Sequence, residues 1–533
     1  MHDTKYSVSV LRRLDSTYVV SAAGIVLYVV SALLIVYRLS PPQPVTNNQP
    51  LTEFSAERAL KHLAVIAQRP HPVGTSEHEA VGNYIQNELV ATGLTPEVQR
   101  TETVTNILVR LKGTSDQKAV MLVGHYDTVP PSPGASDDGA AVASILETLR
   151  ALKSSQQLRN DVIALFSDGE ELGSLGARAF ARNHPWTKDV GVVFNFDARG
   201  TSGPVIMFET SNNNRRLIKE FAKAAPHAAA NSLAPAIYEL MRNKTDMTVF
   251  KEEGLAGLNF GFIAGLNHYH TESDNLMNLD HNSLQHQGTT ALALTRHFGN
   301  LSLTNDSNEN AVYFDVLNSV VISYSERWVV PLAVLVGLSF VVLVVFGFKN
   351  KHLTGEGLAL SFLVFPLTVI SSVLIMFPIG ELLTKFNSTK NLLLFIFVTI
   401  CVVLIINAML SRKVGIPNLL TGSYLWSLIL LVLTSLFLKG GSYLFTWPLL
   451  FNLGALGLVL ARKDRGILPI KHLVLLLVCG IPGIILFSPL VYLTSVALTL
   501  RSFIALFAIA GVMVLLLGPL TPHFAVVAGI RRR

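Results

Sequence analysis

Cysteine and charge are scarce in this chain of 533 residues. The two cysteines, Cys401 and Cys479, lie in apolar runs, so neither a disulfide framework nor a thiolate metal site is available to the rest of the chain. Any metal must therefore be held by His, Asp and Glu. Charged residues make up 15% of the chain, against about 25% in an average soluble domain, and 50% of it is hydrophobic. These proportions exclude an ordinary soluble protein and a disordered one.

Acidic residues are nearly absent from the C-terminal part. Residues 327–533 contain 16 of the 42 Lys and Arg but only three acids, Glu356, Glu381 and Asp464. A sequence pI near 9.1 is also found in nucleic-acid-binding proteins. Here, however, the basic excess lies between apolar runs, which is the pattern of membrane topology. We therefore expect a lipid bilayer, and no nucleic acid, as a partner.

Apolar runs long enough to span a bilayer, which takes about 20 residues, occur at both ends of the chain. The first, residues 17–37, is predicted to be an uncleaved anchor. A cleaved signal peptide is the alternative, but the run is long and no A-x-A-like site follows it before Pro41. Within 328–533 we expect about seven transmembrane helices, at 328–348, 358–381, 391–410, 421–438, 441–461, 471–490 and 502–520. Prolines and glycines in the last two runs leave totals of seven to nine spans open.

The basic residues predict an orientation. With residues 1–16 in the cytoplasm, fourteen Lys and Arg fall in cytoplasmic segments and six in short outer segments. This places residues 51–303 outside the cytoplasm. That region has no cysteine, whereas secreted eukaryotic domains often contain disulfides, so a bacterial inner membrane with a periplasmic domain is favoured. An endoplasmic-reticulum or vacuolar membrane is the alternative.

Residues 51–303 have the pattern of an α/β domain, between linkers at 38–50 and 304–327. Apolar, β-rich runs at 106–111, 119–126, 161–167, 190–196, 204–209 and 257–263 alternate with helical patterns at 55–68, 77–92, 139–153, 173–183, 213–224 and 283–300. This alternation predicts a doubly wound, mostly parallel sheet.

Polar side chains follow four of the predicted strands. They are His125, Asp127 and Asp137–Asp138 in the first segment, Glu170–Glu171 in the second, Asp197 in the third and His268–Tyr269–His270 in the fourth. Singly, each has an ordinary explanation, such as a helix cap, a solvated acidic turn or a turn-forming Asp. Together they would meet at the carboxyl edge of the sheet, where ligands bind.

The combined set supplies two His and at least three carboxylates. Such nitrogen and oxygen ligands suit zinc and, to a lesser degree, manganese or cobalt. Five ligands exceed what one tetrahedral site needs, so a shared carboxylate could bridge two metals about 3.5–4 Å apart.

The order of these motifs, HxD, SDDGA, GEELG, NFDARG and YHT-x-x-D, resembles that of the co-catalytic di-zinc aminopeptidase family, which also includes glutamate-carboxypeptidase-like enzymes and glutaminyl cyclases. The resemblance covers most of 55–300, with further family-like elements at 69–78 and 245–250. The anchor, the α/β domain and the multi-span tail together resemble the branch of the endoplasmic-reticulum metallopeptidases and vacuolar membrane proteases.

The resemblance implies a role for each residue. Asp137 would bridge two zinc ions, His125 and Asp197 would complete one site, and Glu171 and His270 the other. Glu170 would be the general base, Asp127 would hold the His125 ring, and Tyr269 would help to stabilise an oxyanion. His268 has no family role, and Asp138 is expected to be a cap or a supporting group.

Three functions remain open at this stage. The first is a membrane-anchored zinc exopeptidase, in particular an aminopeptidase, that acts on peptides. The second is a glutaminyl cyclase with one zinc ion. The third is a non-catalytic binding module on a membrane scaffold. Oligomeric state leaves no signal in the sequence.

Overall fold

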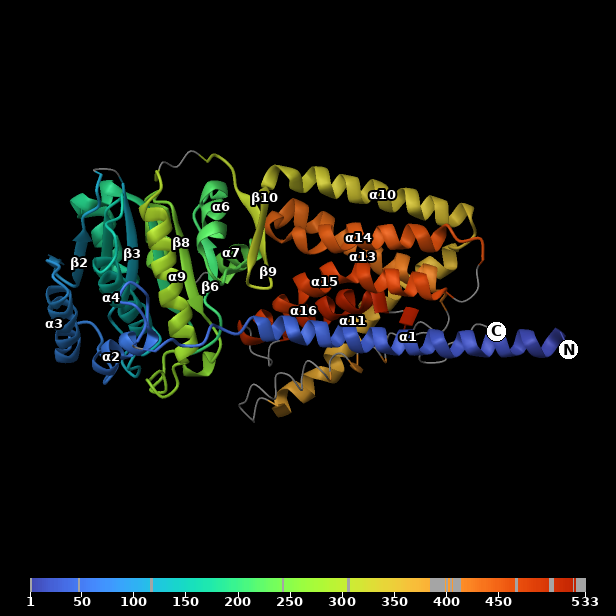
Figure 1. The fold of residues 1–533 in the computed structure, drawn as a ribbon, viewed down its shortest axis with the longest axis horizontal. Helices are drawn as coiled ribbons and strands as arrows, with labels where there is room; N and C mark the ends of the chain where they lie inside the picture. The colour runs from blue at the N-terminus through green and yellow to red at the C-terminus, as the bar shows by residue number, and fades with distance from the viewer. Residues whose placement is uncertain are drawn as a thin grey trace. The chain divides into compact units, whose positions relative to one another are not determined.

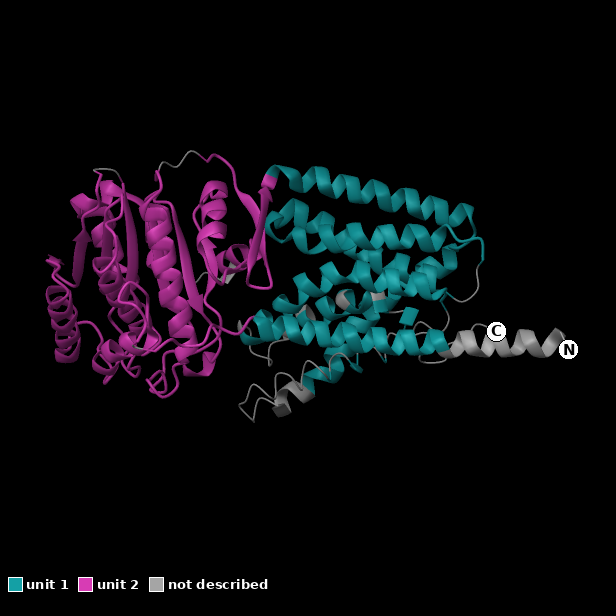
Figure 2. Ribbon diagram, viewed as in Figure 1, with its two compact units in different colours: residues 1–38, 327–533 teal, residues 39–326 magenta. Residues whose placement is uncertain are grey.

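The computed structural model describes residues 2–46, 48–115, 118–241, 244–303, 307–383, 398, 401–402, 405, 414–464, 468–497, 503–520 and 522–523. They form two compact units (Figure 2). The α/β unit comprises Leu39–Glu326, and the helical unit comprises Met1–Arg38 with Arg327–Arg533. Each is described by itself below.

An eight-stranded sheet forms the centre of the α/β unit, in the order β1-β2-β4-β3-β5-β8-β6-β7. The four central strands, β4 (Val162–Ser167), β3 (Ala119–His125), β5 (Val190–Ala198) and β8 (Gly257–Phe262), are parallel. β1 (Glu97–Arg100), β2 (Thr105–Leu111) and β6 (Ile206–Thr210) join through antiparallel pairings, and β7 (Ala229–Ala230) pairs in parallel with β6. The predicted α/β class is confirmed, with a mixed sheet that is parallel at its centre.

Helices cover both faces of this sheet (Figure 1). All seven residues of β3 are buried, with Val120 and Leu122 in one apolar cluster and Met121 and Val123 in the other. The first cluster contains residues of α2 (Ala56–Ile66), α3 (Ser76–Ala91), α4 (Gly139–Lys153), α6 (Arg215–Ala224) and α9 (His281–Gly299). The second contains residues of α5 (Leu175–Asn183) and α8 (Asp246–Glu252). Burial on both faces explains why the central strands are almost continuously apolar.

Some elements differ from the predicted pattern. The segment 304–327, expected to be a linker, contains a two-stranded sheet of β9 (Ala311–Val316) and β10 (Val320–Ser325). Val312 and Tyr313, which point to opposite faces of the strand, are both buried, so β9 is packed on both sides rather than being a simple connection. The short β1 and β7 and the helices α7 (Leu233–Met241) and α8 were also not predicted.

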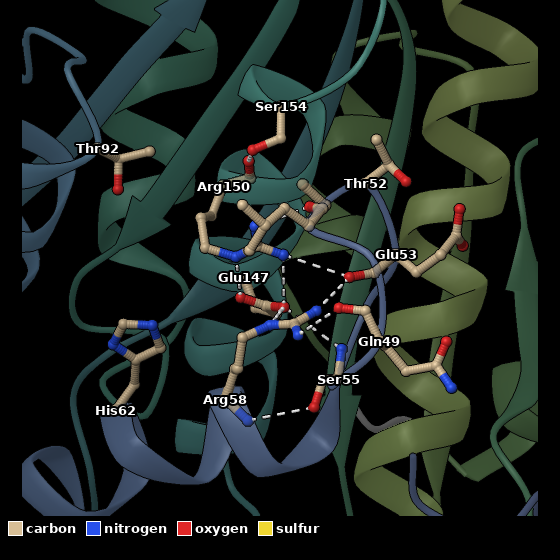
Figure 3. Close-up of polar contacts among 12 residues, drawn as sticks. Gln49, Thr52, Glu53, Ser55, Arg58, His62, Thr92, Glu147, Arg150 and Ser154 are labelled. Atoms are coloured by element: carbon tan, nitrogen blue, oxygen red, sulfur yellow. Dashed lines mark hydrogen bonds and ion pairs between the residues drawn. The ribbon is translucent and has the colours of Figure 1, made fainter. Parts of the chain in front are cut away.

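A buried carboxylate ties the N-terminal segment to the core of the α/β unit. Glu147 of α4 accepts hydrogen bonds from Nε of Arg58 and Nε of Arg150, both at 2.6 Å, and from the backbone N–H of Ser55 at 3.3 Å (Figure 3). Both guanidinium groups also donate to the backbone oxygen of Glu53. The segment that precedes α2 is therefore held by two arginines with one shared counter-charge.

The described α-helices of the helical unit are α1 (His2–Arg38), α10 (Val329–Lys349), α11 (Gly355–Leu383), α13 (Ile416–Phe437), α14 (Tyr443–Leu460), α15 (Ile470–Ala497) and α16 (Phe503–Leu517). Six helices of the described part are long and apolar enough to cross a membrane: Ser16–Arg38, Glu326–Lys349, Gly355–Pro378, Ile416–Phe437, Tyr443–Leu460 and Ile470–Val496. By length and composition, these are helices of a protein that crosses a membrane several times.

Two predicted spans have no counterpart among these six. The run 391–410 lies almost wholly outside the described residues. The run 502–520 corresponds to α16, a helix of 15 residues. The prolines that left 471–490 uncertain do not end α15, which continues through Pro482 and Pro489. Neighbouring helices can satisfy backbone groups that a proline frees inside a membrane helix.

Candidate metal centre

The parallel centre of the sheet brings the four polar segments to one edge. His125 is the last residue of β3 and is paired with Ser167, the last residue of β4. Asp197 lies near the end of β5, opposite Gly261 of β8. Because these neighbours are parallel, the segments that follow them leave the sheet at its carboxyl edge.

Asp137 lies between two imidazoles. Its Oδ1 is 3.2 Å from Nε2 of His125, and its Oδ2 is 3.1 Å from Nε2 of His270. Nε2 of His270 is also 3.0 Å from Oε1 of Glu171. Ligand atoms of His125, Asp137 and Glu171 all lie within 4.8 Å of one another. One carboxylate thus presents each of its oxygens to a different histidine.

The donor set fits a divalent cation. His270 Nε2 is buried and makes no hydrogen bond within the described residues, although two carboxylate oxygens lie within 3.1 Å of it. An imidazole nitrogen in this position has its lone pair available for a metal. His270 itself has a φ of 58°, in the left-handed region, which non-glycine residues adopt mainly where their surroundings enforce it.

Acidic groups are crowded around these ligands. Burial and the charge of Asp137 raise the pKa of Asp197 to about 8. Burial, opposed by the charge of His125 and reinforced by that of Asp197, also raises the pKa of Glu170 well above its usual value. A divalent cation held beside these two carboxylates would favour their charged forms and lower both pKa values. Asp197 lies outside the group of closest ligand atoms, but its pKa responds to Asp137.

The turn that carries Glu170 and Glu171 is held by Asp127. Oδ1 of Asp127 accepts the backbone N–H of Glu170 at 3.0 Å, and Oδ2 accepts that of Glu171 at 3.2 Å. Gly169 begins the turn at a φ of 68°, and a Cβ there would lie 2.7 Å from Cγ1 of Val104. The backbone conformation of Gly169 and the side chain of Asp127 therefore together fix the direction of the two glutamates.

The contacts of Asp127 and Asp138 refine their expected supporting roles. Nδ1 of His125 is 3.0 Å from the backbone oxygen of Asp127 and 3.5 Å from its Oδ1, so the main-chain carbonyl is the closer partner of the ring. Asp138 makes no side-chain cap bond to α4. Instead, its Oδ2 accepts the backbone N–H of His125 at 3.0 Å, which fixes the end of β3.

Tyr269 and His268 lie in the loop that carries His270. The ring of Tyr269 stacks on that of His270, with centroids 3.7 Å apart. Burial and the surrounding carboxylates raise the pKa of Tyr269, so its hydroxyl keeps its proton and can donate a hydrogen bond. His268 pairs instead with Oγ of Ser273 at 2.8 Å, away from the ligand group.

Asp274 is a supporting residue to which the motif analysis gave no role. Its Oδ1 accepts the N–H of Ser136 at 2.8 Å, and its Oδ2 accepts that of Asp137 at 3.1 Å. It thereby links the loop of His270 to the loop of Asp137. The signal was present in the YHT-x-x-D spacing, which places this acid four residues after His270.

The two further family-like segments contact residues at or next to the ends of the strands that lead into the site. In 69–78, His78 Nε2 is 2.8 Å from Oδ1 of Asp168, and its ring stacks on Tyr126. In 245–250, Asp246 hydrogen-bonds Oγ of Ser167, the last residue of β4. Both contacts brace strand ends whose following residues carry the candidate ligands.

Comparison with known families identifies the domain. Residues 106–295 match the model of Peptidase family M28. The chain carries a Peptidase family M28 domain. The predicted resemblance is confirmed by this match and by the relatives. Vacuolar membrane protease of Candida tropicalis is 31% identical over 298 residues, which cover 51% of this chain and 32% of the relative. Endoplasmic reticulum metallopeptidase 1 of Homo sapiens is 32% identical over 235 residues, which cover 42% of this chain and 26% of the relative.

The chain matches no more than about a third of the length of these two relatives. Among solved structures, it is similar to the glutaminyl cyclase of Porphyromonas gingivalis, with 21% identity, a TM-score of 0.39 and coverage of 46% of this chain and 98% of that one. It is also similar to the aminopeptidase LapA of Legionella pneumophila, with 16% identity, a TM-score of 0.39 and coverage of 47% and 74%.

Proposed function

We propose that the α/β unit is a di-zinc metallopeptidase that hydrolyses peptides. The observation that carries this proposal is the position of Asp137, whose two oxygens face His125 and His270 separately. A carboxylate in that position suits a bridge between two cations. Because no thiolate is available in the unit, imidazole and carboxylate ligands favour zinc.

In this proposal each metal has its own ligands. His125 and Asp197 would hold one ion, Glu171 and His270 would hold the other, and Asp137 would be shared between them. Asp274 and Asp127 fix the backbone on which two of these ligands, Asp137 and Glu171, lie. When bound, zinc supplies Lewis acidity, which lowers the pKa of water to about 7.

Glu170 is the proposed general base. It is half-buried and precedes the ligand Glu171 in the turn that Asp127 holds, so its carboxylate lies next to the metal ligands. Its carboxylate would take a proton from the attacking water and deliver it to the leaving amine. The protonated hydroxyl of Tyr269 would donate a hydrogen bond to the oxygen that gains negative charge.

We infer an exopeptidase of the aminopeptidase type, on the order of the motifs. A glutaminyl cyclase with a single zinc ion is the second candidate. The position of Asp137 favours two ions over one. Measurement of zinc per chain by elemental analysis separates the two candidates.

We further propose that the α/β unit faces the periplasm of a bacterial inner membrane, on the distribution of Lys and Arg. The lumen of the endoplasmic reticulum or of a vacuole is the alternative. In intact cells, a cysteine that replaces the exposed Ser154 should react with a membrane-impermeant maleimide. A cysteine that replaces the exposed Asp464 should not react. The reverse labelling would contradict the orientation.

Peptide hydrolysis by the full-length chain in detergent, loaded with zinc, tests the activity. Matched peptides with free and blocked N-termini should be cleaved only when the N-terminus is free. Glu170→Gln should abolish cleavage while two zinc ions remain bound. Glu79→Gln, on the exposed surface of α3, is the matched control and should keep full activity. Unchanged cleavage by Glu170→Gln would refute the proposed base.

A further inference from the structure

A polar cavity lies inside the helical unit, near the middle of its spans. Side chains from α1, α13, α14, α15 and α16 line it. Tyr28, Asn452 and Gly483 line the cavity from the middle parts of Ser16–Arg38, Tyr443–Leu460 and Ile470–Val496. Figure 1 shows α13, α14 and α15 packed together in this unit. The cavity is therefore at mid-depth in the apolar length of the helices.

Hydroxyl and amide groups line this cavity without any charged side chain. Its polar groups come from Tyr28, Ser423, Tyr424, Ser427 and Asn452. A site for an ion at this depth needs charged groups or converging carbonyl oxygens, so the chemistry indicates an uncharged guest.

Two of the lining groups have no partner within the described residues. The hydroxyl of Tyr424 and Oδ1 of Asn452 make no hydrogen bond there. The two residues are 3% and 6% exposed. Surrounding hydrocarbon cannot replace the missing bond, so each unsatisfied buried group destabilises the unit. A guest that accepts from Tyr424 and donates to Asn452 would offset both costs.

The cavity is small. About 20 Å³ of it is open to a water-sized group, which is room for a water or a single hydroxyl. Phe445 and Phe487, with ring centroids 6.1 Å apart, belong to its apolar wall. Together, these dimensions suit one hydroxyl group, with an apolar body outside the polar part.

We propose that this cavity is a binding site for an uncharged hydroxyl group at mid-membrane depth. The hydroxyl accepts a hydrogen bond from Tyr424 and donates one to Oδ1 of Asn452. Water and an uncharged lipid that ends in a hydroxyl offer the same chemistry. The site belongs to the helical unit and is independent of the peptidase proposal.

Gly483 allows the cavity to be filled without strain. A Cβ at this position would lie 3.8 Å from Cδ2 of Phe487 and 3.9 Å from Cβ of Pro448, which is ordinary van der Waals contact with two lining residues. A Cβ at Gly454 of α14 would meet nothing within 4 Å, so Gly454→Ala adds the same methyl group away from the cavity. The pair of variants separates cavity filling from the general effect of replacing glycine in a helix.

Thermal unfolding of the full-length protein in detergent tests the site through the sign of the change. With a hydroxyl guest, Gly483→Ala displaces it and lowers Tm relative to Gly454→Ala by about 2 °C or more. Tyr424→Phe removes one of its bonds and also lowers Tm. Without a guest, Gly483→Ala fills a void and raises Tm, and Tyr424→Phe removes an unsatisfied group and leaves Tm equal or higher. That second pattern would overturn the proposal.

Added ligand identifies the source of the hydroxyl. 1-Dodecanol should raise the Tm of the unsubstituted protein in a concentration-dependent way if a lipid alcohol binds, whereas 1-methoxydodecane, which cannot donate a hydrogen bond, should not. The increase should be lost in Gly483→Ala and kept in Gly454→Ala. Lowered Tm in Gly483→Ala and Tyr424→Phe without any response to dodecanol would assign the site to water.

Discussion

The carboxylate of Asp127 accepts the backbone N–H of Glu170 at 3.0 Å. Through this bond, and through the equivalent one to Glu171 at 3.2 Å, a residue from the segment after β3 sets the direction of the two glutamates after β4. Asp127 is therefore a positioning residue for the proposed base, in addition to its main-chain contact with the His125 ring.

Replacing this carboxylate should impair activity without unfolding the protein. Asp127→Asn keeps one acceptor oxygen but loses the charge and the second acceptor. We expect kcat/KM for peptide hydrolysis to fall by about 10–100-fold, as is typical when a group that orients metal ligands is altered. Asp464→Asn, in a highly exposed position of the helical unit, is the control. Equal kcat/KM for the two variants would contradict the positioning role.

Asp274 should control metal retention more than the proton-transfer step. Asp274→Asn has only one acceptor oxygen for the N–H groups of Ser136 and Asp137, so the proposed bridging carboxylate is held less firmly. We expect zinc affinity to fall by about 10–100-fold. Zinc remaining after dialysis against a graded series of chelator concentrations measures this loss. Excess zinc should restore most of the activity of Asp274→Asn and none of that of Glu170→Gln.

The sequence was sufficient for the central strands, because they are buried on both faces, and for the edge of the sheet at which the polar segments meet. The run 119–126 is apolar on both faces, and β3 indeed ends at His125. Once neighbouring strands are parallel, the polar residues that follow them must leave at one edge. This argument alone brings His125, Asp137, Glu171 and His270 together.

The supporting contacts were beyond sequence reasoning for a physical reason. Which backbone N–H groups Asp127 and Asp274 accept depends on the conformation of nearby turns. The turn at Gly169, with a φ of 68°, is an example, and the residue type alone does not determine such a conformation. Similarly, β9 lies in a stretch expected to be a linker, because a single six-residue strand has a weak pattern until its partner β10 is known.

Removal of Glu147 should strongly destabilise the α/β unit. Its side chain is 1% exposed and is the shared counter-charge of Arg58 and Arg150, so Glu147→Gln leaves two partly buried cations without it. We expect a loss of about 3 kcal/mol in the free energy of unfolding, as for other broken buried ion pairs. Chemical denaturation followed by intrinsic fluorescence measures it. Glu79→Gln, on the exposed face of α3, should change the free energy of unfolding by less than about 0.5 kcal/mol.

The stability of the α/β unit should fall in mild acid because of His286. This residue is 1% exposed, its Nδ1 accepts the N–H of Val205 at 3.1 Å, and its Nε2–H donates to the backbone oxygen of His227 at 2.9 Å. Burial lowers its pKa from 6.5 to about 4. The folded protein therefore holds the imidazole neutral, while the unfolded chain takes up a proton below pH 6.5. The stability that the neutral His286 contributes is fully present above pH 6.5. It is lost progressively as the pH falls toward 4, to a limit of about 3 kcal/mol.

His286→Gln, which offers an acceptor and a donor but cannot titrate, should show a shallower loss of unfolding free energy between pH 7 and 4.5 than the unsubstituted protein. His281→Gln, in an exposed position of the same helix, should keep the steep dependence, and identical slopes for the two variants would assign the acid sensitivity to other groups.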